Sequence, residues 1–402
     1  MNIKKQKKKS KKNKKKIDKY VGRRIAALSI LAFLIIVIII LIINGNKNKK
    51  KDLRILYNNE EISFSNVLVE EEDRIYFSIN DLTKIFDENL YYNDAEKELI
   101  TTYNKHVALL KVDETFMVVN DSNVSLSTSV KEVNDVVYVP INDMEIIYDI
   151  EINYSNEENV LMLDSTSKEK KEATVLKKTK VKEEKGFLKK TIEKIEPNET
   201  LFIIDKNDKY YKVRTKNGNI GFVKENKLSE IKNVRDDLVI SKLDLNILEK
   251  NKDVKNYEKV NIDDKKLNIV NPEIINLDSK SEIATNAVVN TDLFKNYINW
   301  ANENNIYVMP TLKNTESVSS SLLTYAERNK FINELYVFLV KNGAKGIYIN
   351  FAEIDDLNSF YRFLIELTPK FKESGMYVVV ENNKLLDKNK LNSIVDYVVE
   401  EK

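Results

Sequence analysis

The sequence predicts a multidomain protein, in which a transmembrane helix precedes an α+β repeat domain, a small all-β domain and an incomplete α/β domain. Three observations predict this order. Residues 25–43 are uncharged and, apart from Ser29, apolar, residues 54–164 carry one pattern twice, and short β-type runs alternate with helical periodicity from residue 237 to 402. A chain of 402 residues is long enough for two to four domains.

The N-terminal residues predict a membrane anchor. Residues 1–24 contain 13 Lys or Arg and one acid, Asp18, so we expect a tail without a core. The next 19 residues, 25–43, are long enough as a helix to cross a hydrocarbon layer of about 30 Å. No pair of small residues typical of a cleavage site follows, which favours an uncleaved anchor. Because more positive charge precedes the span than follows it, we expect a single-pass plasma-membrane protein with a cytoplasmic N-terminus.

The charge of the chain limits the classes of partner that we expect it to bind. From Asp52 onward there are 48 basic and 62 acidic residues, a net charge of about −14, which disfavours nucleic-acid binding. The basic tail has two open interpretations: it binds anionic lipid headgroups, or it acts as a topology signal alone. The chain has no cysteine and one histidine, His106, so we predict no disulfide, metal site or cofactor.

The first extracytoplasmic module, residues 54–164, contains the repeat. The segment RIYFSINDLTKIF at residues 74–86 aligns with VVYVPINDMEIIY at residues 136–148, at an offset of 62. Each copy predicts a strand, a short helix that begins near Asn-Asp, and two strands around a turn. This unit resembles the copper amine oxidase N-terminal-like domain. Copper needs histidine or sulfur ligands, so the resemblance implies a binding or spacer module and no copper chemistry.

Residues 164–172 are polar and charged, which predicts a linker to a small β domain at residues 173–228. Asn217-Gly218 between two alternating runs predicts a hairpin with a type I′ turn, which needs positive φ at both positions. The short strands and the closing run IGFVKENKL resemble a bacterial SH3-like domain. That resemblance implies binding to wall peptides or glycans, for which Tyr210, Tyr211 and Phe222 form a candidate aromatic platform. The alternative is that these rings form the core of the small barrel.

The third module, residues 237–402, predicts an α/β sheet. The run LVISKLD at 238–244 opens it, and strands are expected at residues 267–277, 306–312, 346–351, 376–381 and 396–401. Helical periodicity lies between them, and Gly343 is the expected C-terminal cap of one helix. At most six strands fit in this length, whereas a TIM barrel has eight strands in about 250 residues. We therefore expect an incomplete, TIM-barrel-like domain.

The run KGIYINFAE at residues 345–353 is the most informative motif of this module. With the Trp300-Ala301 helix before it and IVDYVV after it, the module resembles glycoside hydrolase family 18, in the branch of spore-cortex and cell-wall lytic enzymes. The family's fourth strand carries D-G-x-D-x-D-x-E. Lys345, Tyr348, Asn350 and Ala352 occupy the four acidic positions here, so the motif is degenerate.

The resemblance implies substrate-assisted hydrolysis, in which a glutamic acid protonates the glycosidic oxygen. Ala352 at that position cannot donate a proton, a loss worth about 10²–10⁴ in rate. Alternation predicts positions 348, 350 and 352 on one face, with Tyr348 and Asn350 available as ligand contacts. Glu353 is expected on the opposite face, and Glu381 ends the next strand. These two are the weak candidates for a relocated acid.

Three hypotheses follow. The leading one is a non-catalytic, membrane-anchored envelope protein that binds cell-wall glycan, peptidoglycan or a partner protein, with ligand contacts at Tyr348, Asn350, Tyr211 and Phe222. The second is a family 18-type glycosidase acting on N-acetylglucosamine-containing polymer, with a relocated acid or a barrel completed by a partner. The third is a structural partner of an intact relative, joined through an exposed sheet edge.

Overall fold

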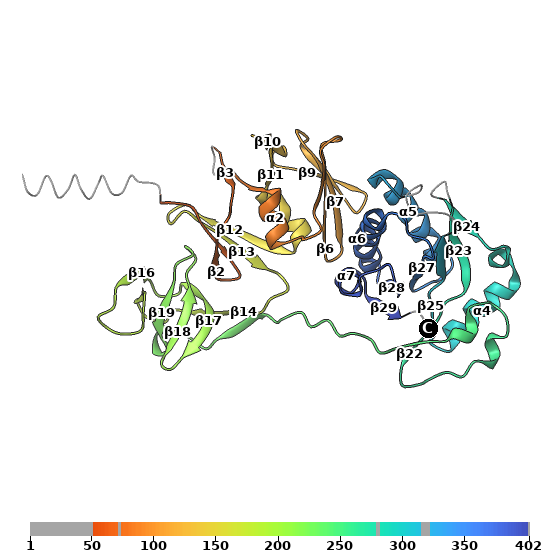
Figure 1. Ribbon diagram of the computed structural model, residues 1–402. Coiled ribbons are helices and arrows are strands. Elements are labelled where there is room, and N and C mark those ends of the chain that lie inside the picture. The colour runs from red at the N-terminus through yellow and green to blue at the C-terminus, as the bar shows by residue number, and fades with distance from the viewer. Residues whose placement is uncertain (1–50, 71–73, 279–281, 315–321, 401–402) are drawn as a thin grey trace, which may run out of the picture.

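A computed structural model describes residues 51–70, 74–278, 282–314 and 322–400 (Figure 1). The basic tail and the predicted span at residues 25–43 lie outside the described residues. Among the helices that the structure describes, none combines the length and the apolar character needed to cross a membrane.

The repeat domain consists of three small sheets around three short helical segments. The sheet orders are β12-β13-β1-β2, β10-β11-β4-β3 and β5-β6-β7-β8-β9. The strands are β1 (Arg54–Tyr57), β2 (Glu60–Ile62), β3 (Val67–Val69), β4 (Ile75–Ser78), β5 (Tyr91–Asn93), β6 (Glu98–Tyr103), β7 (His106–Lys111), β8 (Phe116–Val119), β9 (Ser122–Ser125), β10 (Lys131–Val133), β11 (Val136–Pro140), β12 (Ile150–Ser155) and β13 (Val160–Ser165). The helical segments are α2 (Ile79–Ile85), η2 (Ile141–Met144) and α3 (Glu145–Tyr148).

Both copies of the repeat have the same order of elements. The strand β4 and the helix α2 of the first copy correspond to β11 and the segments η2 and α3 of the second, and β4 pairs with β11 antiparallel. The two Asn-Asp aspartates make equivalent contacts 62 positions apart. Asp81 Oδ1 accepts a hydrogen bond from the Ser65 amide at 2.8 Å, and Asp143 Oδ2 accepts one from the Ser127 amide at 3.0 Å. Asp81 thus fixes the loop before β3, and Asp143 fixes the loop before β10.

The small β domain is one strongly bent antiparallel sheet of order β16-β15-β19-β18-β17-β14-β20. Its strands are β14 (Lys170–Thr174), β15 (Thr179–Lys182), β16 (Thr191–Ile195), β17 (Thr200–Asn207), β18 (Tyr210–Arg214), β19 (Ile220–Lys224) and β20 (Lys232–Arg235), with the turn η3 (Glu225–Lys227) after β19.

Two expectations for this region need correction. The predicted hairpin is present, but β18 and β19 are joined by five residues, and of the Asn217-Gly218 pair only Gly218 has a positive φ, of 80°. The turn is therefore not type I′, and the Asn217 side chain instead donates to Glu193 at 2.9 Å. The predicted linker is also shorter, because β13 ends at Ser165 and β14 begins at Lys170. Asp164 lies within β13, where Arg214 neutralises its charge.

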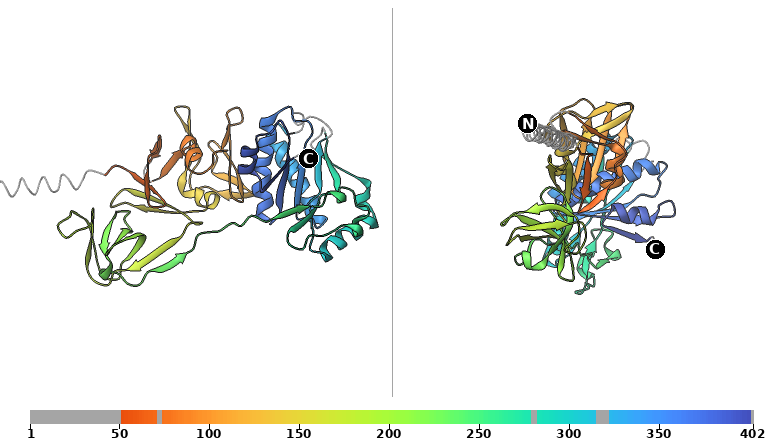
Figure 2. Two further views of the ribbon diagram at one scale, coloured as in Figure 1. Left: turned by 60° about the horizontal axis from the view of Figure 1, so that its bottom comes forward. Right: turned by 90° about the vertical axis from the view of Figure 1, so that its left-hand side faces the viewer.

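The α/β domain has two sheets, of order β21-β22-β25 and β24-β23-β26-β27-β28-β29, with helices on one face (Figure 2). All their strand pairs are parallel except β23 with β24. Its strands are β21 (Leu245–Ile247), β22 (Leu267–Val270), β23 (Glu273–Leu277), β24 (Ile283–Thr285), β25 (Tyr307–Val308), β26 (Thr311–Asn314), β27 (Gly346–Asn350), β28 (Tyr377–Asn382) and β29 (Tyr397–Glu400). The helices are α4 (Asp292–Glu303), α5 (Tyr325–Lys341), α6 (Leu357–Glu373) and α7 (Lys388–Ile394), with short turns η4 (Glu249–Asn251), η5 (Tyr257–Lys259) and η6 (Ala287–Asn290).

Prolines interrupt two of the expected strands. Pro272 separates β22 from β23, and Pro310 separates β25 from β26, because proline has no amide hydrogen to donate to a sheet. The interrupted strands still run side by side, since β22 pairs with β25 and β23 pairs with β26, both parallel. The expected opening strand at residues 238–244 is wrong: this segment has no sheet partner among the residues that the structure describes, and Leu238, Val239 and Ile240 are exposed.

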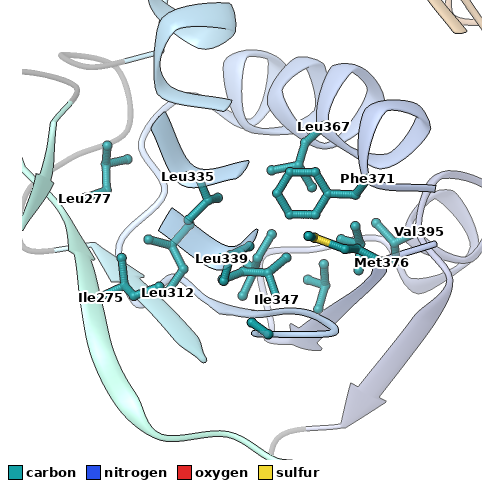
Figure 3. Close-up of a cluster of buried hydrophobic side chains, with 14 of the residues drawn as sticks. Ile275, Leu277, Leu312, Leu335, Leu339, Ile347, Leu367, Phe371, Met376 and Val395 are labelled. Atoms are coloured by element: carbon teal, nitrogen blue, oxygen red, sulfur yellow. The ribbon is translucent and has the colours of Figure 1, made fainter. Parts of the chain in front are cut away.

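Both faces of the parallel sheet are covered, as is usual for this sheet type. The outer face packs on the helices, and Figure 3 shows this core between strands, α5 and α6. The inner face holds a second apolar cluster of Ile269, Met309, Tyr348 and Val379, flanked by further tyrosines. The Tyr397 hydroxyl on β29 accepts a hydrogen bond from the Leu243 amide at 2.8 Å, so the last strand contacts the segment before the first. The interior of the curved sheet is thus filled by side chains and is not a pore.

The three domains are in contact. Arg214 of the small β domain forms two hydrogen bonds to Asp164 of the repeat domain, at 2.8 and 2.5 Å. Asn120 of the repeat domain donates to Glu373 on α6 at 2.8 Å, and Lys370 forms an ion pair with Asp121. The contacts therefore join the repeat domain to both of the others.

Candidate functional site

The candidate site lies at the carboxyl ends of β27 and β28, which are adjacent and parallel. Ile349 pairs with Val380, so the next residues, Asn350 and Glu381, lie side by side at the edge of the sheet. The Tyr348 hydroxyl donates to Glu381 Oε2 at 2.7 Å, and Asn350 Nδ2 donates to the same oxygen at 2.8 Å. We call these three residues the Glu381 cluster.

Alternation along the strands explains this grouping. Ile347 and Ile349 belong to the core beneath the helices, so Tyr348 and Asn350 point to the inner face. On β28, Val379 belongs to the inner cluster, and Glu381 lies two residues further on the same face. Tyr348 is buried, whereas Asn350 and Glu381 are half-buried at the rim. The cluster therefore has an apolar floor and a polar upper edge.

The structure separates the other motif positions from this cluster. Lys345 is exposed and precedes β27, so it lies at the opposite end of the strand. The expectation that position 352 continues the inner face is wrong, because β27 ends at Asn350 and Ala352 is exposed. The Asn314 side chain holds the segment there: its Oδ1 accepts from the Ala352 amide at 3.0 Å, and its Nδ2 donates to the Glu353 carbonyl at 2.6 Å.

Of the two weak candidates, Glu381 lies in the cluster and Glu353 does not. Glu353 is exposed in the loop after β27, where its backbone carbonyl accepts a hydrogen bond from the Asn314 side chain. Glu381 reaches the Tyr348 and Asn350 side chains from the neighbouring strand. The signal for this residue in the sequence is its position, as an acid at the carboxyl end of a parallel strand, where ligands bind α/β sheets.

The electrostatics of the cluster fix the role of its phenol. Burial raises the pKa of Tyr348 well above its usual range, and the hydrogen bond to Glu381 and the negative charges of Glu381 and Glu249 raise it further. The phenol is therefore a neutral hydrogen-bond donor at physiological pH. Glu249 begins η4, just after β21, and sequence reasoning missed it because a short turn carries no periodic signal.

Asn271, which directly follows the carboxyl end of β22, is a further buried polar residue. The Asn271 carbonyl accepts a hydrogen bond from Thr311 Oγ1 at 2.8 Å, while Asn271 Oδ1 is buried without a hydrogen-bond partner among the described residues. Asn271 follows Ile269, which belongs to the inner cluster, by two positions. A buried amide oxygen without a donor is costly, so this position favours a bound hydroxyl or water.

The proposed aromatic platform on the small β domain is not present as expected. Tyr211 is opposite Val223 and is buried in the domain core, whereas Phe222 is opposite Lys212 and therefore points to the other face. Tyr210 is on the face of Phe222, since it lies one residue from Tyr211. Tyr211 is thus a core residue, and the rings of Tyr211 and Phe222 do not form one surface.

His106 does not form a metal centre. Its Nε2 lies 3.8 Å from Asp149 Oδ1, and its Nδ1 is buried without a hydrogen-bond partner in the described part of the chain. Across the described ranges there is no group of three or more His, Cys, Asp or Glu side chains placed to hold a metal ion. These residues do not fit a copper site.

Comparison with known proteins gives one family match. Residues 56–163 match the family model described as copper amine oxidase N-terminal domain, which agrees with the predicted module at residues 54–164. No curated protein matches the chain.

Several solved structures are similar to the chain. They include the C-terminal domain of a putative chitinase from Desulfitobacterium hafniense, with 17% identity and a TM-score of 0.33 over 40% of this chain and 54% of that one. A chitinase from Chromobacterium violaceum has 14% identity and a TM-score of 0.32, over 40% and 55% of the two chains. A putative sporulation-specific glycosylase from Bacillus subtilis has 17% identity and a TM-score of 0.28, over 32% and 47%. The chain spans about half the length of these structures.

Proposed function

We propose that the protein is a membrane-anchored, extracytoplasmic envelope protein that binds cell-wall glycan at the Glu381 cluster without hydrolysing it. The observation that carries this proposal is the sharing of Glu381 Oε2 by Tyr348 and Asn350. The degenerate family 18-like motif supports a sugar as the ligand, and the apolar span at residues 25–43 supports the anchor.

The cluster offers the groups that a sugar binds. Asn350 and the free lone pairs of the Glu381 carboxylate can contact hydroxyl and acetamido groups, and the tyrosine-rich inner face lies below them. Glu381 Oε2 accepts from both side chains, so that oxygen is engaged as an acceptor. The general acid of a glycosidase must carry a proton toward the glycosidic oxygen, which here would have to be on Oε1.

The alternative function is a glycosidase in which Glu381 replaces the missing acid. One observation favours it: Glu381, unlike Glu353, reaches the face of Tyr348 and Asn350. The two functions differ in what the isosteric variant Glu381→Gln does. An acceptor role survives this change in part, since the glutamine carbonyl still accepts from Tyr348, whereas acid catalysis does not survive it.

The test is binding of the full chain, in detergent or nanodiscs, to purified peptidoglycan. We expect Glu381→Ala to weaken binding at least about tenfold, because it removes a charged acceptor and leaves Tyr348 and Asn350 without their partner. Glu381→Gln should bind within a few-fold of the wild type. Glu353→Ala is the matched control and should leave binding unchanged.

Equal binding by Glu381→Ala and wild type would contradict the proposed site. Capture of an envelope protein that competes with glycan and is lost in Glu381→Ala would assign the cluster to a protein partner instead. Hydrolysis that disappears in Glu381→Gln would establish the glycosidase.

A further inference from the structure

The loop between β15 and β16 of the small β domain carries two large apolar side chains at its tip. Phe187 is 82% exposed and Leu188 is 93% exposed. They are adjacent in sequence and form what we call the apolar tip. Single exposed apolar residues are ordinary, but two adjacent large ones at the end of a projecting loop favour contact with an apolar environment.

The loop that presents the apolar tip is held in place. The Glu183 amide donates to the Lys190 carbonyl at 3.1 Å, which closes the base of the loop. Lys182 Nζ donates to the Phe187 carbonyl and lies 5.2 Å from the centre of the Phe187 ring. Gly186 has a φ of 131°, which glycine adopts without strain. The apolar tip is therefore directed away from the domain and does not fold back onto its core.

Lysines surround the apolar tip. Residues 182–190, KEEKGFLKK, contain four lysines and two glutamates. Glu184 pairs with Lys189, Glu183 lies 3.9 Å from Lys190, and Lys185 lies 3.5 Å from Asp208 outside the loop. The loop itself has a net charge of about +2. Lysine beside an exposed aromatic and a leucine is typical of a loop at a membrane surface, where the aliphatic stem lies among lipids and the ammonium group meets headgroups.

The whole small β domain has an excess of basic residues, whereas the repeat domain has an excess of acidic ones. Residues 170–235 contain 19 basic and 10 acidic residues, whereas residues 52–169 contain 8 basic and 26 acidic ones. An anionic surface therefore attracts the small β domain and repels the repeat domain. This difference in charge orients the molecule with the small β domain toward such a surface.

The apolar tip also lies at the appropriate end of the molecule. Figures 1 and 2 show the β15–β16 loop at the same end as the first described residues, and the α/β domain at the other end. Seven residues, 44–50, separate the predicted span from residue 51, and an extended chain of this length reaches about 25 Å. A membrane that holds the predicted span is thus close to this end of the structure.

We propose that Phe187 and Leu188 insert into the interface of an anionic lipid bilayer, with the neighbouring lysines on the headgroups. A charged wall polymer would meet the lysines but would not bury a leucine and a phenylalanine together, so lipid fits the loop better. This second contact would hold the domains in a fixed orientation relative to the membrane. It is independent of glycan binding at the Glu381 cluster.

The test uses the absence of cysteine from the chain. The full-length Leu188→Cys variant is labelled with an environment-sensitive fluorophore and reconstituted into vesicles of phosphatidylcholine and phosphatidylglycerol. The matched control is Leu385→Cys, because Leu385 is also an exposed leucine, at 56%, but belongs to the α/β domain. We expect a blue shift and quenching by bromolipids at position 188, and quenching by aqueous iodide at position 385.

A variant with reversed charge in the loop tests whether insertion needs anionic lipid. In the Leu188→Cys background, Lys189→Glu with Lys190→Glu should reduce the inserted fraction about tenfold or more, as should vesicles of phosphatidylcholine alone. Iodide quenching at position 188 equal to that at position 385 would overturn the proposal. So would a blue shift caused by purified wall sacculi and not by vesicles, since the apolar tip would then face wall polymer.

Discussion

At the scale of single residues, hydrogen bonds to carboxylates decide what the important acids do. Glu381 accepts from Tyr348 and Asn350, and Asp81 accepts from the amides of Ser65 and Asn66. The Glu381 carboxylate lies at an open rim and can accept a further hydrogen bond. The Asp81 carboxylate is buried with its hydrogen bonds satisfied, and it stabilises the repeat domain.

Asp81 predicts a specific dependence of stability on pH. Burial alone would raise the pKa of this carboxyl, but the hydrogen bonds from Ser65, Ser78 and Asn66 outweigh it and hold the pKa below its ordinary value of 3.8. A group whose pKa is lowered on folding stabilises the protein above its unfolded pKa, and this stabilisation is lost as the pH falls through the folded value. The wild type should therefore lose stability on acidification below about pH 4.

Urea unfolding between neutral and acidic pH checks this prediction. Asp81→Asn should be less stable than wild type at neutral pH, by about 1–3 kcal/mol, and the difference should shrink on acidification. Asp94→Asn is the control, because Asp94 is an exposed acid of the same domain. A constant difference between Asp81→Asn and wild type at every pH would contradict the assigned role.

The sequence predicted the residues of the candidate site better than their arrangement. Tyr348 and Asn350 follow from strand alternation, because two residues on one strand share a face whatever surrounds them. The contact to Glu381 depends on the register of β27 against β28, which local sequence does not specify. Ala352 was misplaced because the side chain of Asn314, 38 positions away, ends the strand.

At the scale of elements, helices α5 and α6 are joined by a buried ion pair. Arg328 Nε and Nη2 donate to Glu366 at 2.7 and 2.8 Å, and Arg328 Nη1 also donates to the carbonyls of Leu322 and Leu323. Arg362, one turn before Glu366 on α6, lies 3.6 Å from the same carboxylate. The pair fixes the register of the two helices across the outer face of the sheet.

Removing one partner of this pair should be costly. Arg328→Met leaves Glu366 buried with Arg362 alone, so we expect a loss of about 3 kcal/mol in the free energy of unfolding, at the lower end of values for broken buried pairs. The double variant Arg328→Met with Glu366→Leu should recover much of this loss. Lys330→Met, on the exposed side of α5, should change stability by less than about 0.5 kcal/mol.

Denaturant unfolding distinguishes these outcomes. If the double variant is as unstable as Arg328→Met, the cost comes from lost packing, and the ion pair does not account for it. A large effect of Lys330→Met would likewise contradict the distinction between buried and exposed pairs.

The long periodic elements were predictable, and the interrupted ones were not. Helix α5 follows from its apolar period, and Gly343 just beyond it has the positive φ, 68°, expected of a C-terminal glycine. The apolar run at residues 238–244 has the composition of a strand, but no neighbour pairs with it, and a strand needs a partner. Composition alone does not show whether a partner exists.

At the scale of the whole molecule, the small β domain contacts the repeat domain where the backbone of Gly218 lies against the Val160 side chain. A Cβ atom added to Gly218 would lie 2.5 Å from Val160 Cγ1 of β13. Nearby, Ile220 packs against Leu56, Val160 and Met162. The hairpin between β18 and β19 therefore needs glycine for contact as well as for its φ of 80°.

Gly218→Ala should weaken this interface. Gly375→Ala is the matched control, because Gly375 has a similar φ of 70° but no atom within 4 Å of an added Cβ. Both variants incur the strain of a positive φ, about 1–2 kcal/mol, and Gly218→Ala also incurs the clash. We expect faster proteolysis between β13 and β14 in Gly218→Ala than in Gly375→Ala, and equal rates would contradict the interface.

We propose that the Glu381 cluster binds sugar and does not cleave it. The most direct test is incubation of the full chain with an N-acetylglucosamine oligomer, with binding followed by calorimetry and the oligomer length then measured by mass spectrometry. We expect binding that is lost in Glu381→Ala and an oligomer of unchanged length. Shortened oligomers with the wild type, and intact ones with Glu381→Gln, would contradict it.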